Sequence, residues 1–478
     1  MTDPLALLPL AAAARGGTVD GLESSALVAA GLTLLQRSAP LVRALAGRRA
    51  GILLPTSPAF LTALAASEGR GAVLMNPLAA PRELAYQIAD AQVGAVFTTA
   101  ALGDRLPREL PRVLLDDAPR SATIVAGGST RAIDLGSHFP LALEGDPSTE
   151  GRDEEAAIVY TSAMSGRPLG AILTHRNLLA NARATVQAAE LADHDHFLAA
   201  LPFSHLFGLV VAGVAPLLAG ARVTTMPRFN PLRALGRLED DVTHFVGVPA
   251  MYVAMLAALE GRGEAFRAAA LRVCICGGAP LPMDVQDRWF DATGVELRQG
   301  YGLTEASPVA LFNRTGMPNV RGTLGLPYPG VEVTVRDPAS GRECAAGAAG
   351  EISVRGPTVF AGYVGAGAGA PTGLEVRDGW LRTGDLGVVR DDGRIEFRGV
   401  RKPMFTRNGF NIYPRELELA VAELSGVESA AVRAIPDPAH ENGIELRVRG
   451  DVSEADVRVW CAERLSAYKQ PTVVIVGG

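Results

Sequence analysis

The chain has 478 residues, too many for one ordinary hydrophobic core, so two or more structural units are expected. Hydrophobic residues make up 48% and charged residues 20% of the sequence, which is typical of a folded globular protein and excludes a disordered one. The formal net charge is -6 and both signs are mixed along the chain, so no nucleic-acid partner is expected.

The cysteines and the N-terminal segment bear on the compartment. Four scattered cysteines are too few for a disulfide framework, and none has the spacing of a zinc site. The sequence has no uncharged apolar run of about 18 residues, and no basic segment precedes an apolar core at its start. We therefore expect a cytoplasmic protein without a membrane span.

Residues 1–150 alternate helical patterns with short apolar runs. The spacing of the apolar residues predicts a helix over 26–45, a strand over 49–54 and a helix over 57–67. Repetition of strand and helix predicts a largely parallel sheet with helices on its faces. The N-terminal part is therefore expected to have an α/β fold.

A strand beginning at residue 157 leads into a loop of short polar residues, within the run 157–170 (AIVYTSAMSGRPLG). The hydroxyl groups of Thr161, Ser162 and Ser165 can surround a phosphate group. Gly166 leaves the main chain free to approach the same group. The spacing is not that of a Walker loop, because no Gly-Lys-Ser/Thr sequence follows. The alternative is a solvent-exposed turn.

Two histidine-containing runs follow. Four adjacent residues at 193–196 (DHDH) cannot easily converge on one ion, so a solvated loop is expected there rather than a metal site. His205 lies in the apolar run 201–209 (LPFSHLFGL). A lone histidine in such a run is usually a satisfied core residue, and the alternative is a residue that lines a pocket.

The run 299–308 (QGYGLTEASP) carries the strongest chemical signal. Glycines on both sides of Tyr301 let the main chain come close to a flat ring. The hydroxyl of Thr304 followed directly by the carboxylate of Glu305 can serve a phosphate oxygen and its Mg²⁺ together. The alternative is a helix start, with Thr304 as the N-cap and Glu305 in the first turn.

The remainder of the chain divides into a strand-rich part and a mixed part. Short alternating strands are predicted over 331–335, 350–355, 387–389 and 395–397, and Asp385 lies on a glycine turn among them. From residue 415 onward the pattern is helix, strand, strand, helix, strand.

These motifs occur in an order that resembles the adenylate-forming superfamily of acyl-CoA synthetases and other AMP-binding enzymes over about residues 20–476. Fatty acyl-CoA ligases are the most similar members. The resemblance implies an α/β fold with a large N-terminal AMP-binding domain, 1–401, containing two doubly wound sheets and a distorted β-barrel. It also implies a small, shortened α+β lid domain, 402–478, that moves about a hinge at Lys402.

The resemblance also assigns roles in nucleotide binding. It implies that Tyr301 and Gly302 stack on adenine, that Thr304 contacts the α-phosphate, and that Glu305 holds Mg²⁺. Asp385 matches the aspartate that binds both ribose hydroxyls.

Further roles follow for the loops around the nucleotide. The loop of Thr161, Ser162, Ser165 and Gly166 matches the segment that holds the β- and γ-phosphates. The main chain at Gly278 and Ala279 matches the turn that lies along the acyl adenylate.

The acyl and thiol groups are assigned in the same way. His205 matches a residue that gates the acyl pocket, and Gly409 and Phe410 match the loop presented to a pantetheine thiol. The resemblance thus implies ATP or AMP, Mg²⁺ and coenzyme A as cofactors, or the phosphopantetheine of an acyl carrier protein in place of coenzyme A. The substrate is expected to be a small carboxylic acid, apolar and of medium or greater length.

The sequence departs from the superfamily at several points. Met164 replaces a hydroxyl residue and Leu169 a lysine in the phosphate loop, and Val400 replaces an arginine unless Arg401 substitutes for it. A terminal Gly-Lys pair whose lysine serves adenylation does not occur before Gly478. We therefore expect slow adenylation, and the alternatives are a non-adenylating relative that binds or transfers a pre-activated acyl group and a carrier-protein loading ligase.

Overall fold

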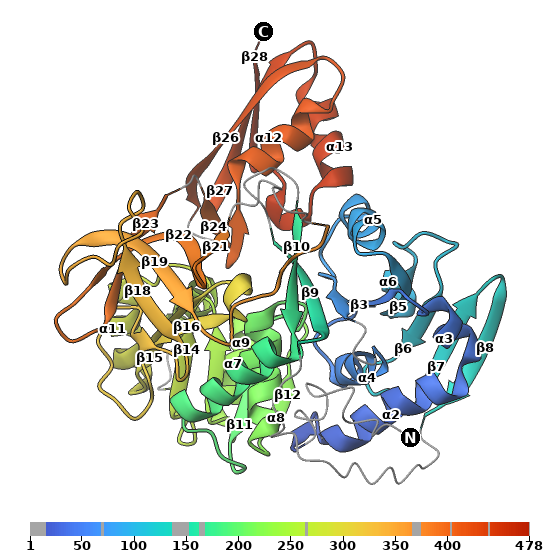
Figure 1. Cartoon of the computed structure of the whole chain (residues 1–478), viewed down its shortest axis with the longest axis horizontal. Helices are drawn as coiled ribbons and strands as arrows, with labels where there is room; N and C mark the ends of the chain where they lie inside the picture. The colour runs from blue at the N-terminus through green and yellow to red at the C-terminus, as the bar shows by residue number, and fades with distance from the viewer. Residues whose placement is uncertain are drawn as a thin grey trace.

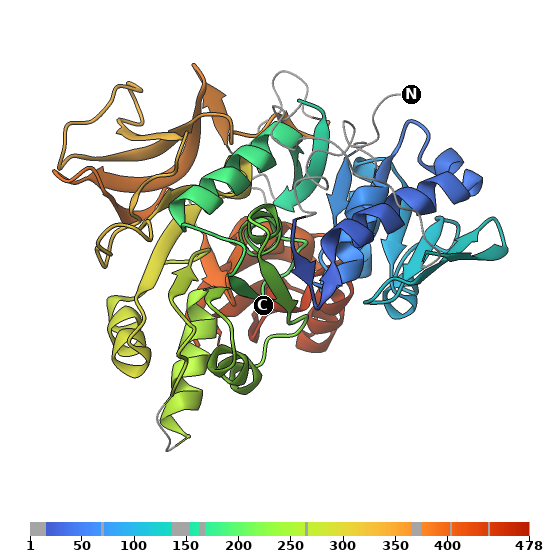
Figure 2. The ribbon, with the colours of Figure 1, turned by 90° about the horizontal axis from the view of Figure 1, so that it is seen from below.

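The computed structural model describes residues 16–67, 71–135, 153–161, 168–262, 266–365, 374–401, 404–437 and 440–477. Two large sheets with helices packed on them lie side by side, and a smaller sheet flanks one of them (Figure 1). The C-terminal unit lies over the junction of the two halves, as the view from below also shows (Figure 2).

The first large sheet is parallel in its centre and antiparallel at its ends. Its strand order is β17-β16-β15-β14-β13-β11-β12-β1-β2. The strands are β1 (Thr18–Val19), β2 (Leu22–Glu23), β11 (His196–Ala199), β12 (Arg222–Thr225), β13 (His244–Gly247), β14 (Val273–Cys276), β15 (Leu297–Gly302), β16 (Val309–Phe312) and β17 (Leu326–Pro327).

The second large sheet has the same character, with five parallel strands between antiparallel ends. Its strand order is β20-β10-β9-β4-β3-β5-β6-β7-β8. The strands are β3 (Arg49–Leu53), β4 (Ala72–Leu74), β5 (Val93–Thr98), β6 (Arg112–Leu115), β7 (Ser121–Ala126), β8 (Ser129–Asp134), β9 (Glu155–Thr161), β10 (Leu169–Thr174) and β20 (Gly362–Tyr363).

Helices connect the parallel strands, as the alternating pattern predicts. The predicted helix over 26–45 is split in two, because Ser38 accepts a hydrogen bond from the Leu41 N–H and starts a new helix. The helices are α2 (Ser24–Arg37), α3 (Ala39–Ala44), α4 (Pro58–Ala66), α5 (Pro81–Asp90), α6 (Ala100–Gly103), α7 (His175–Ala188), α8 (Ala215–Leu218), α9 (Pro231–Glu239), α10 (Pro249–Glu260), α11 (Met283–Thr293), the π-helical segment η2 (Phe207–Val214) and the 3₁₀ turn η3 (Thr304–Ala306).

The strand-rich part forms an open sheet, so the prediction of a distorted β-barrel is wrong for the described residues. The strand order is β18-β19-β22-β21, with β23 paired to β22, and β18 and β21 remain edges that do not close on each other. The strands are β18 (Glu332–Arg336), β19 (Ala349–Arg355), β21 (Glu375–Arg377), β22 (Trp380–Val389) and β23 (Ile395–Val400).

The C-terminal unit has its own hydrophobic core, in which Leu417, Leu446 and Val457 are each 2% exposed or less. A hairpin precedes two helices that pack on a three-stranded sheet, and this is the predicted α+β pattern. The elements are β24 (Phe405–Arg407), β25 (Phe410–Ile412), α12 (Pro414–Ala422), β26 (Val427–Asp437), β27 (Glu441–Gly450), α13 (Glu454–Arg464), η4 (Ala467–Lys469) and β28 (Val473–Gly477).

The run 193–196 is less exposed than predicted. Asp195 is fully buried and contacts His244 and the guanidinium of Arg272, and His196 bonds Asp241 at 2.9 Å. These contacts link β11 to its neighbours in the first sheet, so the prediction of a solvated loop is wrong for Asp195 and His196. In the described ranges, no group of three or more His, Cys, Asp and Glu side chains could hold a metal ion.

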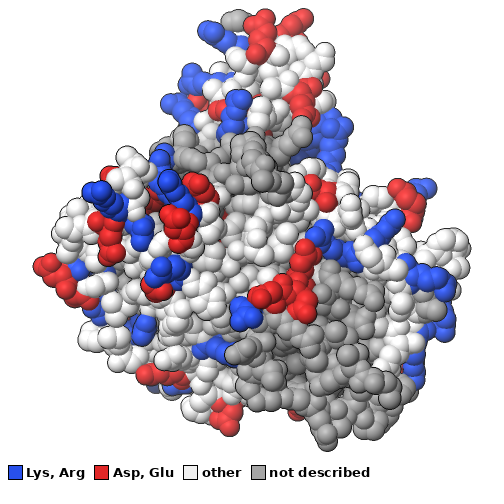
Figure 3. Space-filling model, viewed as in Figure 1, with Lys and Arg blue, Asp and Glu red and all other residues white. Residues whose placement is uncertain are grey.

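Surface charges of both signs are interleaved on the face shown in Figure 3, as the composition predicts. None of the helices in the described part of the chain combines the length and the hydrophobicity that crossing a membrane requires.

Candidate active site

A cavity of about 250 Å³ lies where the carboxyl ends of β14 and β15 meet the second large sheet, the open sheet and the C-terminal unit. Ligands of open α/β sheets bind at the carboxyl ends of strands, in the crevice where the chain changes direction. The lining includes Thr161, Tyr301 and Asp385 from three different sheets and Gly409 from the C-terminal unit. The predicted site residues therefore come from segments far apart in the sequence.

The run 299–308 forms one wall of this cavity. Tyr301, Gly302, Thr304 and Glu305 all line it. A Cβ atom on Gly302 would lie 1.8 Å from the carbonyl oxygen of Pro308, so only glycine fits where β15 turns. The glycine at 302 is thus required by the close packing of β15 against Pro308, whereas the predicted approach of the main chain to a flat ring stays a prediction.

Glu305 is a buried carboxylate, 4% exposed, whose recorded partners are neutral. Its Oε1 accepts hydrogen bonds from the hydroxyl of Tyr363 at 2.7 Å and from the hydroxyl of Thr161 at 3.3 Å. Burial raises the pKa of Glu305, while these hydroxyls oppose that rise. A carboxylate held by hydroxyl groups suits Mg²⁺, which takes oxygen ligands and is commonly bound through one or two carboxylates together with phosphate oxygens.

Asp385 also lines the cavity, from a turn inside β22. Its Oδ2 accepts a hydrogen bond from the hydroxyl of Tyr301 at 2.7 Å. Burial raises the pKa of Asp385 to about 6, although the bond from Tyr301 acts in the other direction. Tyr301 and Asp385, predicted to bind the adenine and the ribose of one nucleotide, are thus in contact.

His205 joins the N-terminal part to the C-terminal unit through a stack of rings. The His205 and Phe410 rings pack edge to face with centroids 5.8 Å apart, and Phe410 stacks on Tyr468 at 4.2 Å. The imidazole faces the cavity, where its ring is exposed, and the protein packed around it lowers the pKa of His205. The ring is therefore neutral at neutral pH and sits where an acyl gate is predicted.

Gly409 packs against the N-terminal part at a point where a side chain would clash. It has φ of 76°, and a Cβ atom there would lie 2.7 Å from a Val248 methyl group. Its carbonyl oxygen also lies near Gly278, which lines the cavity. Gly409, Phe410 and Gly278 thus meet at one rim of the cavity, whereas Ala279 is not among the described residues that line it.

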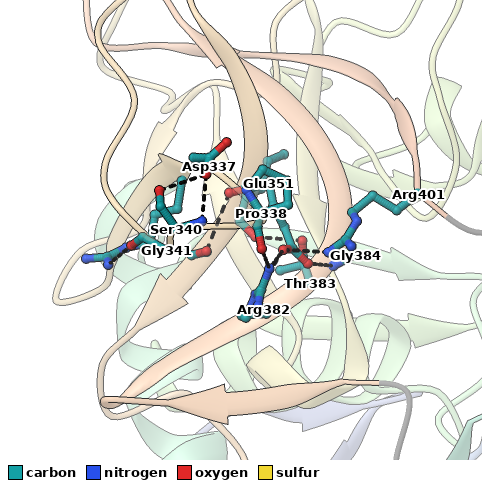
Figure 4. A network of polar contacts seen from close by, with 12 residues as sticks. Asp337, Pro338, Ser340, Gly341, Glu351, Arg382, Thr383, Gly384 and Arg401 are labelled. Carbon is teal, nitrogen blue, oxygen red and sulfur yellow. Dashed lines mark hydrogen bonds and ion pairs between the residues drawn. The ribbon is translucent and has the colours of Figure 1, made fainter.

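Several predicted residues lie outside the described part of the chain. These residues are Ser162, Ser165 and Gly166 of the phosphate loop and Lys402 of the hinge. Of that loop, Thr161 is described, and it lines the cavity. Val400 also lines the cavity. Arg401 is not among the described residues of the lining, and its guanidinium donates a hydrogen bond to Glu351 at 3.0 Å (Figure 4).

Two residues of the site had no signal in the sequence. Tyr363 reaches Glu305 from β20, 58 residues along the chain, and Glu441 accepts a hydrogen bond from the Gly409 N–H at 3.4 Å. Each is an isolated residue in an ordinary strand, so no local spacing could have indicated it.

Comparisons with known proteins agree with this geometry. Residues 40–364 match the family model described as AMP-binding enzyme. A feruloyl-CoA synthase from Amycolatopsis sp. is 34% identical over 436 residues, covering 90% of this chain and 84% of the relative. A long-chain-fatty-acid–CoA ligase from Bacillus subtilis is 28% identical, covering 89% of this chain and 81% of the relative.

A solved structure of a malonyl-CoA ligase, in a ternary product complex with methylmalonyl-CoA and AMP, superposes with a TM-score of 0.81. It is 27% identical, and the match covers 100% of this chain and 99% of that one. The chain therefore belongs to the AMP-binding enzyme family. Within that family it is an acid–thiol ligase of the acyl-CoA synthetase type, which works through an acyl adenylate.

Proposed function

We propose that this ligase activates an apolar monocarboxylic acid with ATP and transfers the acyl group to the thiol of coenzyme A. The observation that carries the proposal is the composition of the cavity. Two carboxylates, Glu305 and Asp385, line one part of it, apolar side chains line another, and Gly409 lies at its rim.

The apolar part of the cavity supports the choice of acid. Two neighbouring glycines, Gly277 and Gly300, are flanked by aromatic rings. Phe207 lies against Gly277, and Phe312 lies against Gly300. The Phe312 ring packs edge to face on Tyr328. No lysine or arginine occurs among the described residues of the lining, so a second carboxylate would be desolvated there without a cation.

The proposed nucleotide contacts follow from the two carboxylates. Asp385 binds the ribose hydroxyls, Tyr301 stacks on adenine, and Thr304 donates to the α-phosphate. Glu305 would hold Mg²⁺, which when bound neutralises charge on the phosphate oxygens. The acid's carboxylate oxygen then attacks the α-phosphorus, the bond from that phosphorus to the bridging oxygen breaks, and pyrophosphate leaves with the electron pair.

The proposed second step uses the C-terminal unit in the position seen here. The thiol approaches along Gly409 and Phe410 and loses its proton to solvent. Its sulfur attacks the acyl carbonyl carbon, the bond from that carbon to the phosphate oxygen breaks, and AMP leaves with the electron pair on this oxygen. Neutral His205 lines the acyl entrance and needs no proton transfer to do so. We propose that the boundary of the moving domain falls between residues 401 and 402 and that Lys402 is the hinge.

A panel of acids tests the proposal. Octanoate, ferulate and malonate are supplied separately with ATP, Mg²⁺ and coenzyme A, and acyl-CoA and AMP are measured by mass spectrometry. We expect kcat/KM for malonate to be at least about tenfold lower than for octanoate or ferulate, because an unpaired buried carboxylate costs more than about 1.4 kcal/mol. Preferred formation of malonyl-CoA would contradict the apolar assignment.

The same assay addresses the alternatives left by the sequence. Acyl-CoA formed from supplied acyl-AMP but never from acid and ATP would favour the non-adenylating relative. An acyl carrier protein as the acceptor and a cytoplasmic location stay predictions.

A further inference from the structure

Glu351 is a buried carboxylate that lies outside the cavity, on β19, and is 3% exposed. Its Oε2 accepts hydrogen bonds from Arg382 Nη2 at 2.6 Å and Nε at 3.0 Å and from Arg401 Nη1 at 3.0 Å (Figure 4). Its Oε1 accepts a hydrogen bond from the Gly384 N–H at 3.0 Å. Two cations and one main-chain amide thus converge on one side chain.

The amide of Gly384 belongs to an irregularity in the sheet. Glu351 pairs with Leu386 and Ser353 pairs with Arg382, so residues 383–385 of β22 oppose the one residue of β19 between these pairs. Such bulges leave ladder hydrogen bonds unmade, re-aim a side chain, and are frequent beside active sites. Gly384 has φ of 78°, which bends the strand at the centre of the bulge.

Side chains replace the missing ladder bonds. The Thr383 hydroxyl donates to the Ile352 carbonyl at 2.8 Å and accepts from the Asp385 N–H at 3.1 Å. Between Thr383 and Asp385, the N–H of Gly384 donates a hydrogen bond to Glu351. The conformation that points Asp385 into the cavity therefore depends on the side chains of Thr383 and Glu351.

The contacts that hold the 383–385 turn continue to Arg401, directly after β23. The Arg401 N–H donates to the Gly384 carbonyl at 2.8 Å, while its guanidinium reaches Glu351. Both main-chain groups of Gly384 are therefore held, one by Glu351 and the other by Arg401. Arg382 is fixed in turn by the Pro338 carbonyl at 2.8 Å (Figure 4).

We propose that Glu351 is a positioning residue that holds the 383–385 turn so that Asp385 faces the nucleotide, and that it ties this turn to Arg401 beside the predicted hinge. The inference rests on the proposed function, because it takes Asp385 as the carboxylate that binds the ribose. Glu351 itself touches no ligand in this account and acts through Asp385.

The test measures the affinity for AMP by calorimetry at pH 7.5. Glu351→Gln keeps the size of the side chain, but its amide nitrogen cannot accept from Gly384 or from an arginine. We expect AMP to bind about five- to tenfold more weakly, less than for the loss of a charge-assisted hydrogen bond made directly to the ligand, because Glu351 acts through Asp385. Glu332→Gln is the matched control, because Glu332 pairs with Arg355 on the exposed part of the same sheet. It should leave the affinity within about twofold.

A double-mutant cycle with Asp385→Asn separates this inference from the proposed function. If Glu351 acts through Asp385, Asp385→Asn weakens AMP binding and adding Glu351→Gln weakens it no further. Unchanged affinity in Glu351→Gln, or a loss that multiplies with that of Asp385→Asn, would overturn the positioning role. No loss in Asp385→Asn would remove the ribose assignment itself and the inference with it.

Arg401→Gln provides a second variant should Glu351→Gln fail to fold, since thermal unfolding will show which variants are native. In this variant Glu351 still accepts hydrogen bonds from Arg382 and Gly384, so we expect a smaller loss of AMP affinity, about two- to threefold. When Asp385 is already replaced by Asn, Arg401→Gln should cause no further loss of affinity. A loss of equal size in both backgrounds would overturn the role.

Discussion

Two of the regions in which this ligase holds buried or half-buried carboxylates differ in the partners of those carboxylates. In the cavity, Glu305 and Asp385 accept hydrogen bonds from neutral hydroxyl groups. At the contact between the C-terminal unit and α5, Glu83 and Glu416 share the ammonium group of Lys469 at 3.0 and 2.6 Å. Among the described residues of these two regions, only the second contains a cationic side chain that bonds the carboxylates.

The difference supports the proposal that the cavity, and not the contact with α5, binds a ligand. A buried anion without a cation is costly, and burial accordingly raises the pKa of both cavity carboxylates. Burial of Lys469 would lower its pKa, but Tyr468, Glu416 and Glu83 raise it overall, so the ammonium ion persists. The carboxylates at α5 are thus neutralised by the protein itself, whereas in the proposed function Mg²⁺ and ribose hydroxyls would supply partners to the cavity carboxylates.

The largest effect on stability is expected when the ammonium group of Lys469 is removed from the contact with α5. Lys469→Met leaves two buried carboxylates side by side without a cation, and such a loss costs about 3–5 kcal/mol. We expect a fall of this size in the free energy of unfolding, measured with denaturant. Arg415→Met, which removes an exposed contact to Glu418, should cost less than about 0.5 kcal/mol. Equal effects of the two variants would show that the buried contact carries no special stability.

Glu305→Gln tests the cavity through catalysis. Loss of the proposed Mg²⁺ carboxylate should slow pyrophosphate exchange by about 10² to 10³, the usual cost of one preorganised electrostatic contact. The free energy of unfolding should not fall, because the amide is cheaper to bury than the carboxylate. Glu332→Gln is again the control, with unaltered exchange. Exchange at the normal rate in Glu305→Gln would exclude Glu305 as the metal carboxylate.

Asp385→Asn should stabilise the unliganded protein above neutral pH. A folded pKa of about 6, above the ordinary 3.8, means that Asp385 contributes stability below pH 4 that is lost as the pH rises through 6. The variant should therefore exceed the wild type by about 1–3 kcal/mol at pH 8. The two should converge near pH 4. A destabilised variant at pH 8 would show that the ionised carboxylate is favoured without ligand.

The smallest effect is expected at His205. Because its imidazole is neutral, His205→Ala should change the preference among acid chain lengths by several-fold, about 1 kcal/mol. The pH dependence of turnover should stay the same. Values of kcat/KM across a series of fatty acids provide the measurement, and loss of a titration limb with unchanged chain preference would assign His205 a proton-transfer role instead.

The sequence was informative where chemistry is local. The glycine spacing around Tyr301, the Thr304–Glu305 pair and the glycine turn at Asp385 each lie within a few residues, and all of them line one cavity. The alternation of strand and helix over residues 1–150 likewise predicted a largely parallel sheet, and the resemblance to the superfamily implied the second large sheet.

What the sequence did not reveal depends on contacts between distant segments. The bond from Tyr363 to Glu305 spans 58 residues, and that from Arg401 to Glu351 spans 50. The open edges of β18 and β21 and the break at Ser38 likewise depend on pairing and capping geometry, which periodicity does not encode.

The central claim is that the cavity carboxylates lack a cation because they serve a ligand, and the affinity for adenosine as a function of pH tests it most directly. Adenosine has no phosphate, whose own pKa near 6 would obscure the result. We predict that binding, measured by calorimetry or ligand-observed NMR, strengthens about tenfold from pH 5 to 7.5 with a midpoint near 6, as Asp385 ionises and can accept from the ribose. Asp385→Asn should bind weakly at every pH. Affinity independent of pH in the wild type, or the same step in Asp385→Asn, would contradict the account.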